Sequence, residues 1–235
     1  MTTDHDPDDD ETPLARAVRA GDLDLVRGQI AAGVELHDAL WVAVWPTTDE
    51  IPANAVAILT ALLDAGADPN QAWDGESALY LAAKHPALLR VLLERGADPN
   101  RATANGETPL SFCADWGHIE SVRVLLAGGA DPNHVMPVLS WPILFVAAAQ
   151  GAVAILDSLL DAGADPLHEN ERGQTALAVA LDHRQTECAA RLIDRVPAVA
   201  GRGTVDLVAA ARQIPDDALA NRIAAARSGS PVRSS

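Results

Sequence analysis

Short apolar stretches alternate with polar turns along most of the 235-residue chain, and two such stretches separated by a turn make up each period. A loop containing glycine and proline follows the second stretch of each pair. Glycine readily adopts the left-handed conformation that ends a helix, and proline prevents the helix from continuing. The pattern therefore predicts a series of helical hairpins joined by loops. One nonapeptide marks these loops: LLDAGADPN at 62–70, LLERGADPN at 92–100, LLAGGADPN at 125–133 and LLDAGADPL at 159–167.

The spacing of the loop glycines shows that the chain is built from repeats. Their positions differ by 33, 30, 33 and 34 residues. A second motif lies upstream of each loop, and in its best copies a threonine precedes a proline, as at Thr12-Pro13 and Thr108-Pro109. Threonine is a good N-cap, and proline is well accommodated at the first helical position. The five marker glycines are Gly33, Gly66, Gly96, Gly129 and Gly163.

These motifs resemble ankyrin repeats, in which a β-turn precedes two antiparallel helices. The stretch GETPLSFCADWGHIESVRVLLAGGADPN, at 106–133, is close to a consensus unit. The resemblance implies an all-α ankyrin-repeat solenoid of about six helix–turn–helix units with short β-turn loops. Terminal repeats usually differ from the others, so a helical C-terminal cap is expected at 202–227. The expected units are 11–36, 37–70, 71–100, 101–133, 134–167 and 168–201, with disordered tails at 1–10 and 228–235.

Two of the chain's departures from the family pattern bear on its expected structure. Extra residues with two prolines predict a loop at 45–54 in the second unit. The histidine of the family's Thr-Pro-Leu-His motif is also absent, so packing is expected to replace the hydrogen bonds of that side chain. The residues at its position are Ala15, Trp41, Tyr80, Ser111, Phe145 and Ala178.

Composition and charge narrow the class of partner. Hydrophobic residues make up 49% of the chain but aromatic residues only 3%, so alanine and leucine are expected to fill the core. The formal net charge is −16, which is unfavourable for binding nucleic acid or an anionic membrane. A basic protein partner is compatible with this charge, and solubility alone is the alternative interpretation. The acidic N-terminus has no apolar run of a signal peptide, and no stretch is long enough to span a membrane.

The sequence contains no motif of a catalytic, cofactor or metal site, so the chain is expected not to be an enzyme. The repeated aspartates of the GADP loops could suggest calcium, but turn stabilisation explains one aspartate per loop better. Cys113 and Cys188 lack metal or disulfide spacing and are expected to be free thiols in the cytoplasm. Sixteen arginines against one lysine suggest a bacterial source, and a monomer is the default expectation.

The family resemblance also suggests where a partner would bind. In ankyrin repeats, partners contact the hairpin tips and the exposed ends of the inner helices. Among the tryptophans at these places, Trp45, Trp73 and Trp116 are predicted to be exposed, whereas Trp41 and Trp141 are interpreted as filling space beside irregular loops. The candidate partner-binding residues are Trp45, Trp73, Asp74, Glu76, Lys84, Asn105, Glu107, Asp115, Trp116, Trp141 and Arg172.

The function predicted from these features is binding of a partner protein on the concave face formed by hairpins and inner helices. Two alternatives stay open: an immunity- or antitoxin-like inhibitor of a basic enzyme, and a structural scaffold in a larger complex. A toxin or effector gene beside this one would favour the inhibitor. An enzyme with an unrecognised site is a further alternative.

Overall fold

The computed structural model describes residues 12–45, 51–136 and 140–195, which divide between two compact units, Met1–Ala104 and Asn105–Ser235. The predicted tails and the predicted C-terminal cap at 202–227 lie outside the described residues. Positions 46–50 of the predicted loop do so as well, whereas residues 51–54 are described and form neither helix nor strand.

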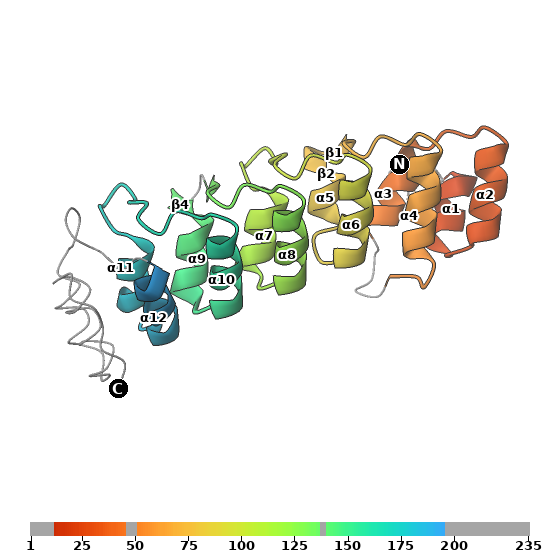
Figure 1. The fold of residues 1–235 in the computed structure, drawn as a ribbon. Helices are drawn as coiled ribbons and strands as arrows, with labels where there is room; N and C mark the ends of the chain where they lie inside the picture. The colour runs from red at the N-terminus through yellow and green to blue at the C-terminus, as the bar shows by residue number, and fades with distance from the viewer. Residues whose placement is uncertain (1–11, 46–50, 137–139, 196–235) are drawn as a thin grey trace, which may run out of the picture. The chain divides into compact units, whose positions relative to one another are not determined.

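The first unit consists of helix pairs and one short β-hairpin (Figure 1). We call the first helix of each pair an inner helix and the second an outer helix. The inner helices α1, α3 and α5 contact one another in sequence order, and so do the outer helices α2, α4 and α6. The elements are α1 (Pro13–Arg19), α2 (Leu23–Ala31), α3 (His37–Val44), α4 (Ala55–Asp64), β1 (Ala72–Trp73), β2 (Glu76–Ser77), α5 (Ala78–Leu81) and α6 (Pro86–Glu94).

The second unit repeats this arrangement. Its inner helices are α7, α9 and α11, and its outer helices are α8, α10 and α12, again with contacts along each row. The elements are α7 (Pro109–Asp115), α8 (Ile119–Ala127), β3 (Val135–Met136), β4 (Trp141–Pro142), α9 (Ile143–Gln150), α10 (Val153–Asp161), α11 (Ala176–Asp182) and α12 (Thr186–Arg195).

The core of each unit lies between its two rows of helices and consists mainly of leucine, alanine and valine. Leu59 and Leu62 of α4 are fully buried, as is Leu92 of α6, and Phe145 is the largest fully buried side chain described. These helices and their loops confirm the predicted all-α ankyrin-type fold. The number of ankyrin repeats, about six, stays a prediction. None of the described helices has the length and hydrophobicity needed to cross a membrane.

The predicted helix caps are present. The hydroxyl of Thr12 accepts a hydrogen bond from the Ala15 N–H at 3.2 Å, and Pro13 occupies the first helical position. Thr108 and Ser111 form a reciprocal capping box at the start of α7. Ser111 occupies the position of the missing family histidine, where packing was expected to replace hydrogen bonds. The expectation is wrong at this position, because the Ser111 side chain forms hydrogen bonds of its own. A serine there reaches the Thr108 N–H and carbonyl, at 2.8 and 2.9 Å.

Each GADP loop is closed by its aspartate, as the turn interpretation predicts. In all four copies, the Asp Oδ1 accepts a hydrogen bond of 2.9 Å from the backbone N–H two residues later. The loop glycines have positive φ angles; Gly66, for example, has φ 101°. The aspartate carboxylates therefore stabilise the loop backbone, and no group of three or more potential metal ligands exists among the described residues.

The asparagine that ends the nonapeptide joins successive loops within a unit. Asn70 donates to the Gly96 carbonyl at 3.0 Å and accepts from the Asp98 N–H at 2.7 Å. Asn133 makes the corresponding bonds in the second unit, to the Gly163 carbonyl at 3.3 Å and from the Asp165 N–H at 2.8 Å. Each asparagine side chain thus satisfies a backbone donor and a backbone acceptor of the next loop, and it fixes the distance between the two successive loops.

Replacing either bridging asparagine should destabilise its unit. Asn70→Ala and Asn133→Ala each remove two hydrogen bonds and leave loop backbone groups without those partners, so each should lower the free energy of unfolding by about 1–2 kcal/mol. Urea denaturation followed by circular dichroism measures this loss. Asn105→Ala is the matched control, because Asn105 is exposed and should change stability by less than about 0.5 kcal/mol. Equal effects at positions 133 and 105 would contradict the bridging role.

Candidate functional site

Helix α3 carries aromatic and acidic side chains along one face. Asp38, Trp41 and Trp45 are spaced three and four residues apart, so they lie on the same side of the helix. The two indoles are in edge-to-face contact, with ring centroids 5.8 Å apart and an interplanar angle of 84°. Trp45 caps the end of the helix and is 50% exposed, and Trp41 is 37% exposed. The face therefore presents aromatic surface to solvent.

The β1–β2 hairpin faces this helix and adds two more carboxylates. Asp74 and Gly75 form its two-residue turn, with φ angles of 50° and 84°, while Trp73 and Glu76 pair across the strands. Positive φ at both central residues is the property of a type I′ turn, for which Asp-Gly is a favoured sequence. The turn places Asp74 at the exposed tip, with Glu76 half-buried beside it.

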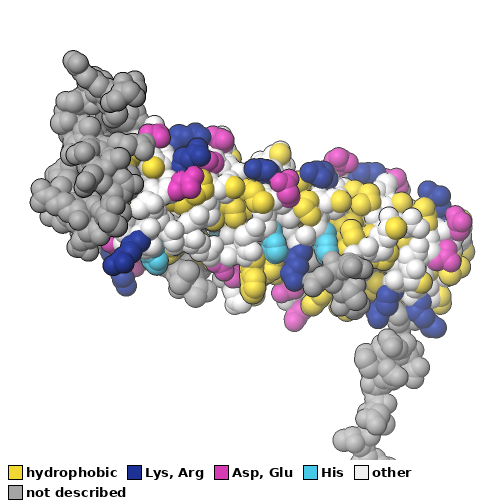
Figure 2. All heavy atoms as spheres, turned by 90° about the horizontal axis from the view of Figure 1, so that it is seen from below, with side chains coloured by type: hydrophobic (Ala, Val, Ile, Leu, Met, Phe, Trp, Pro, Cys, Tyr) yellow, Lys and Arg dark blue, Asp and Glu magenta, His cyan; other side chains and the backbone are white. Residues whose placement is uncertain are grey.

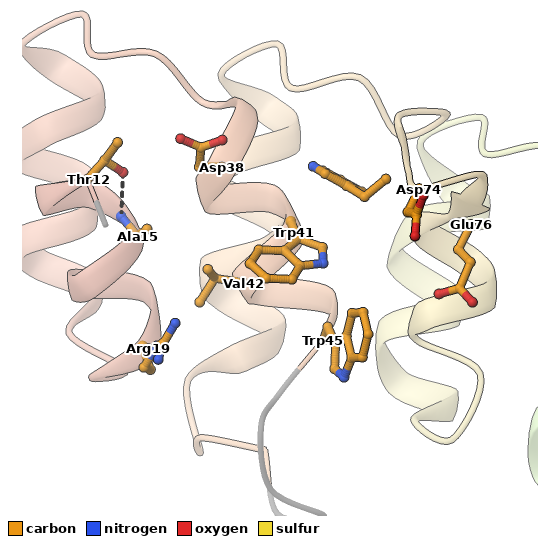
Figure 3. Close-up of a pocket in the computed structure, with 10 residues that line it drawn as sticks. Thr12, Ala15, Arg19, Asp38, Trp41, Val42, Trp45, Asp74 and Glu76 are labelled. Atoms are coloured by element: carbon orange, nitrogen blue, oxygen red, sulfur yellow. Dashed lines mark hydrogen bonds between the residues drawn. The ribbon is translucent and has the colours of Figure 1, made fainter. Parts of the chain in front are cut away.

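Helices α1 and α3 and the β1–β2 hairpin line an open pocket of about 630 Å³, which we call the tryptophan pocket (Figure 3). Figure 3 shows Trp41 and Trp45 in the middle, with Arg19 on one side and Asp74 and Glu76 on the other. Three carboxylates and one guanidinium line the pocket, so its charged groups are predominantly acidic. Its lining residues are Thr12, Ala15, Arg19, Asp38, Trp41, Val42, Trp45, Trp73, Asp74 and Glu76.

The carboxylates at the hairpin end of the pocket differ from those on the outer helices. Within the described residues, the side chains of Asp74 and Glu76 form no hydrogen bond or ion pair. On the outer helices, by contrast, arginines pair with aspartates of the preceding outer helix. These pairs are Arg95–Asp64 at 2.9 Å, Arg191–Asp157 at 3.3 Å and Arg195–Asp161.

On the face of the molecule shown in Figure 2, the acidic charge is not gathered into a single patch. Acidic and basic side chains are interspersed on this face. Six of the 33 acidic residues of the chain lie at positions 4–11, outside the described residues. Among the described residues, Asp74 and Glu76 have no cationic partner, as is also true of other surface carboxylates such as Glu35; what sets the two apart is their place in a pocket lined by tryptophans.

In the second unit, Trp116 occupies the end of inner helix α7, as Trp45 occupies the end of α3. It is 67% exposed, the highest value among the exposed large hydrophobic residues, and its ring lies 5.9 Å from that of Phe112. Asp115 beside it accepts hydrogen bonds from Gln150 on α9, at 3.1 Å through its carbonyl and 2.9 Å through its carboxylate. The next inner helix thus holds the end of α7 that carries Trp116.

The other residues expected to bind a partner are spread over the hairpins. Lys84 is exposed after α5, Asn105 is exposed, and Glu107 is half-buried before α7. Arg172 is exposed in the turn before α11, where its N–H donates to Asn170 Oδ1 at 2.9 Å. Trp141 on β4 is half-buried, with its ring 6.3 Å from that of Phe145 and 6.5 Å from that of His183.

Two predictions about individual tryptophans are wrong. Trp41 was interpreted as filling space, but it is exposed and forms a wall of the pocket. Trp73 was predicted to be exposed, but it is half-buried: its ring stands 5.9 Å from that of His37, and its Nε1 is buried without a hydrogen-bond partner. The hairpin folds Trp73 back toward α3, which the register of the repeat alone does not indicate.

The pocket brings together four of the predicted residues, Trp45, Trp73, Asp74 and Glu76, and adds several that the sequence analysis missed. The contributions of Asp38 and Trp41 could have been found from their helical spacing relative to Trp45. Arg19 gave no such signal, because its place depends on the packing of α1 beside α3.

The two cysteines are buried and free. Burial raises the pKa of Cys113 to about 12. Burial also raises the pKa of Cys188 to about 11, and the charges of Glu187 and Asp157 add to this effect. Both thiols are therefore protonated at neutral pH and poorly suited to act as nucleophiles.

Comparison with known proteins identifies ankyrin repeats in the chain. The family model described as "Ankyrin repeats (3 copies)" matches residues 51–136. A curated relative, "Ankyrin repeat and SAM domain-containing protein 6" of Danio rerio, is 39% identical over 62 residues. This match covers 26% of the chain and 8% of the relative, so the similarity concerns a repeat segment and not the whole of that protein.

Thiol labelling should report the burial of the cysteines. In the unfolded chain both thiols should have an ordinary pKa near 8.5 and react readily at pH 8. In the native protein the raised pKa values suppress the thiolate, so labelling by an aromatic disulfide at pH 8 should be at least about tenfold slower than in urea. The absorbance of the released thiolate measures both rates. Rapid labelling of either thiol in the native protein would contradict the described burial.

Substitution of tryptophans should separate packed side chains from exposed ones. Trp116→Ala removes a side chain that is largely in solvent and should change the free energy of unfolding by less than about 0.5 kcal/mol. Trp73→Ala removes a half-buried ring and should cost about 2 kcal/mol. Thermal and urea unfolding provide the comparison. A larger loss at Trp116 than at Trp73 would show that the described burial is incorrect.

Proposed function

The chain belongs to the ankyrin-repeat family, whose repeats are generally protein–protein interaction modules, and on this premise we propose that it binds a partner protein through its inner-helix and hairpin face. This face comprises the exposed ends of the inner helices and the adjoining hairpins. The observation that carries the proposal is the exposure of a tryptophan at the C-terminal end of an inner helix in each unit, Trp45 after α3 and Trp116 after α7.

Exposed tryptophan at these places is costly to leave in water and useful in an interface. A tryptophan supplies a large, rigid contact area, and it is the residue type most enriched among interface hot spots. Neither Trp45 nor Trp116 is needed to fill the core, which lies between the two rows of helices. Their exposure is therefore better explained by binding than by folding.

The acidic character of the chain favours a basic partner. Carboxylates lie near both tryptophans: Asp74 and Glu76 in the tryptophan pocket, and Asp115 beside Trp116. Such charges accelerate encounter with a surface of opposite sign, and salt weakens this effect. We therefore expect association with the partner to slow as ionic strength rises, while dissociation changes less.

The test is affinity capture from the native host with wild-type protein and three variants, followed by mass spectrometry and a measured affinity for the protein recovered. Trp45→Ala and Trp116→Ala should each weaken binding by about 2 kcal/mol or more, because each removes an anchor that the interface desolvates. Leu25→Ala is the matched control, since Leu25 is 48% exposed but lies on outer helix α2.

Circular dichroism of each variant separates loss of binding from loss of fold. Unchanged affinity in both folded tryptophan variants would overturn the proposed face. So would a loss confined to Leu25→Ala, which would place the interface on the outer helices instead.

A further inference from the structure

We propose that the tryptophan pocket binds an arginine side chain of the partner, with the guanidinium lying between the Trp41–Trp45 pair and the carboxylates of Asp74 and Glu76. This inference rests on the proposed function and deepens it, because it names the chemical group that the first unit recognises. It follows from the combination of an aromatic wall, unpaired carboxylates and an open pocket large enough to admit a side chain in one place.

The aromatic wall is suited to a cation. Cations are attracted to the face of an indole ring, and tryptophan is the strongest partner among the aromatic side chains. The edge-to-face contact between Trp41 and Trp45 turns the two rings 84° apart, so they present differently oriented surfaces to the same space. A planar group can stack on one ring while its edge approaches the other.

The carboxylates define which end of the pocket the cation occupies. Asp74 and Glu76 come from the hairpin, and Figure 3 shows them on the opposite side of the indoles from Arg19. A cation beside Arg19 would meet a like charge, whereas a cation beside the hairpin would meet two carboxylates. Asp38, on α3, is hydrogen-bonded to His37 Nδ1 at 2.9 Å, so its carboxylate already has a partner.

Some carboxylates on the outer helices are paired with arginines, whereas Asp74 and Glu76 are not paired with any described residue. On the outer helices, aspartates at the repeat period are paired with arginines of the next outer helix, as in Asp64 with Arg95. At the hairpin end of the pocket, no described residue supplies such an arginine to Asp74 or Glu76. At Asp74 and Glu76, an arginine from a partner would form the kind of ion pair that the chain's own arginines form with aspartates on the outer helices.

Charge also argues against the N-terminal stretch, and against a second copy of the chain, as the occupant. The N-terminal stretch at 4–11 contains six acidic residues and no lysine or arginine, so its charge has the same sign as that of the hairpin. A second copy of the chain, with a net charge of −16, would also be repelled on approach. Arginine is preferred over lysine because its planar guanidinium can stack on an indole and donate two hydrogen bonds to a carboxylate at once.

The experiment uses the full chain and three small probes: N-acetyl-arginine methylamide, the corresponding lysine compound, and the corresponding citrulline compound. Citrulline is nearly isosteric with arginine but uncharged, so it separates cation binding from simple filling of the pocket. Titration is followed by NMR through the indole N–H signals, assigned with Trp41→Phe and Trp45→Phe. The arginine probe should shift the signals of Trp41 and Trp45 and bind at least about fivefold more tightly than the citrulline probe.

Variants test the role of the hairpin carboxylates. Asp74→Asn keeps the turn, because Asn-Gly is also favoured in a type I′ turn. Asp74→Asn and Glu76→Gln should each weaken binding of the arginine probe several-fold. Glu94→Gln is the matched control: Glu94 is a surface carboxylate on outer helix α6 with a side chain 69% exposed, and its loss should leave probe binding unchanged.

The outcomes distinguish this inference from the proposed function. Equal binding of the arginine and citrulline probes, absence of any shift at Trp41 and Trp45, or tighter binding of the lysine probe would each overturn the arginine site. If these occur while Trp45→Ala still abolishes partner binding, the proposed function stands without this site. If the arginine probe binds as expected but the partner is insensitive to Trp45→Ala and Trp116→Ala, the proposed face is overturned and the pocket stands alone.

Discussion

Each helix pair of this chain must pack against a neighbouring pair in order to bury its apolar residues. Leu59 and Leu62 lie on α4, which contacts α2 on one side and α6 on the other, and both are fully buried. A helix with apolar surface toward two neighbours has no stable isolated state, and stability in repeat proteins arises largely from such neighbour contacts. The spacing between pairs is therefore the constraint that the rest of each unit depends on, and the loop asparagines fix it from the edge of the stack.

This constraint explains why the candidate binding residues can be large and exposed. The core of each unit is filled mainly by leucine, alanine and valine between the rows of helices, whereas the ends of the inner helices and the hairpin tips lie outside it. Trp45 and Trp116 cap inner helices, and since no described element packs fully over them they remain 50% and 67% exposed. The candidate binding residues and the residues that stabilise the core thus occupy different positions of the same repeat.

The sequence was sufficient where structure is determined by short-range rules. Thr12 and Thr108 cap their helices, and Gly66 adopts the left-handed conformation, because neighbours a few residues away fix each of these states. The pocket depends on the packing of three elements, so it could be predicted only in part. Trp73 illustrates the limit: its position in the repeat indicated exposure, but the type I′ turn at Asp74-Gly75 directs its ring toward His37.

The hydrogen bonds of Asn70 and Asn133 have a consequence for how such a chain can evolve. Both asparagines bind main-chain atoms of the following loop, a carbonyl and an N–H, which every repeat with that loop conformation offers whatever its side chains. The connection between successive repeats therefore requires no matched pair of residues. A repeat can be duplicated, lost or exchanged in one genetic event without a compensating substitution in its neighbour, and the residues at hairpin tips can diversify under selection while the contacts between loops stay the same.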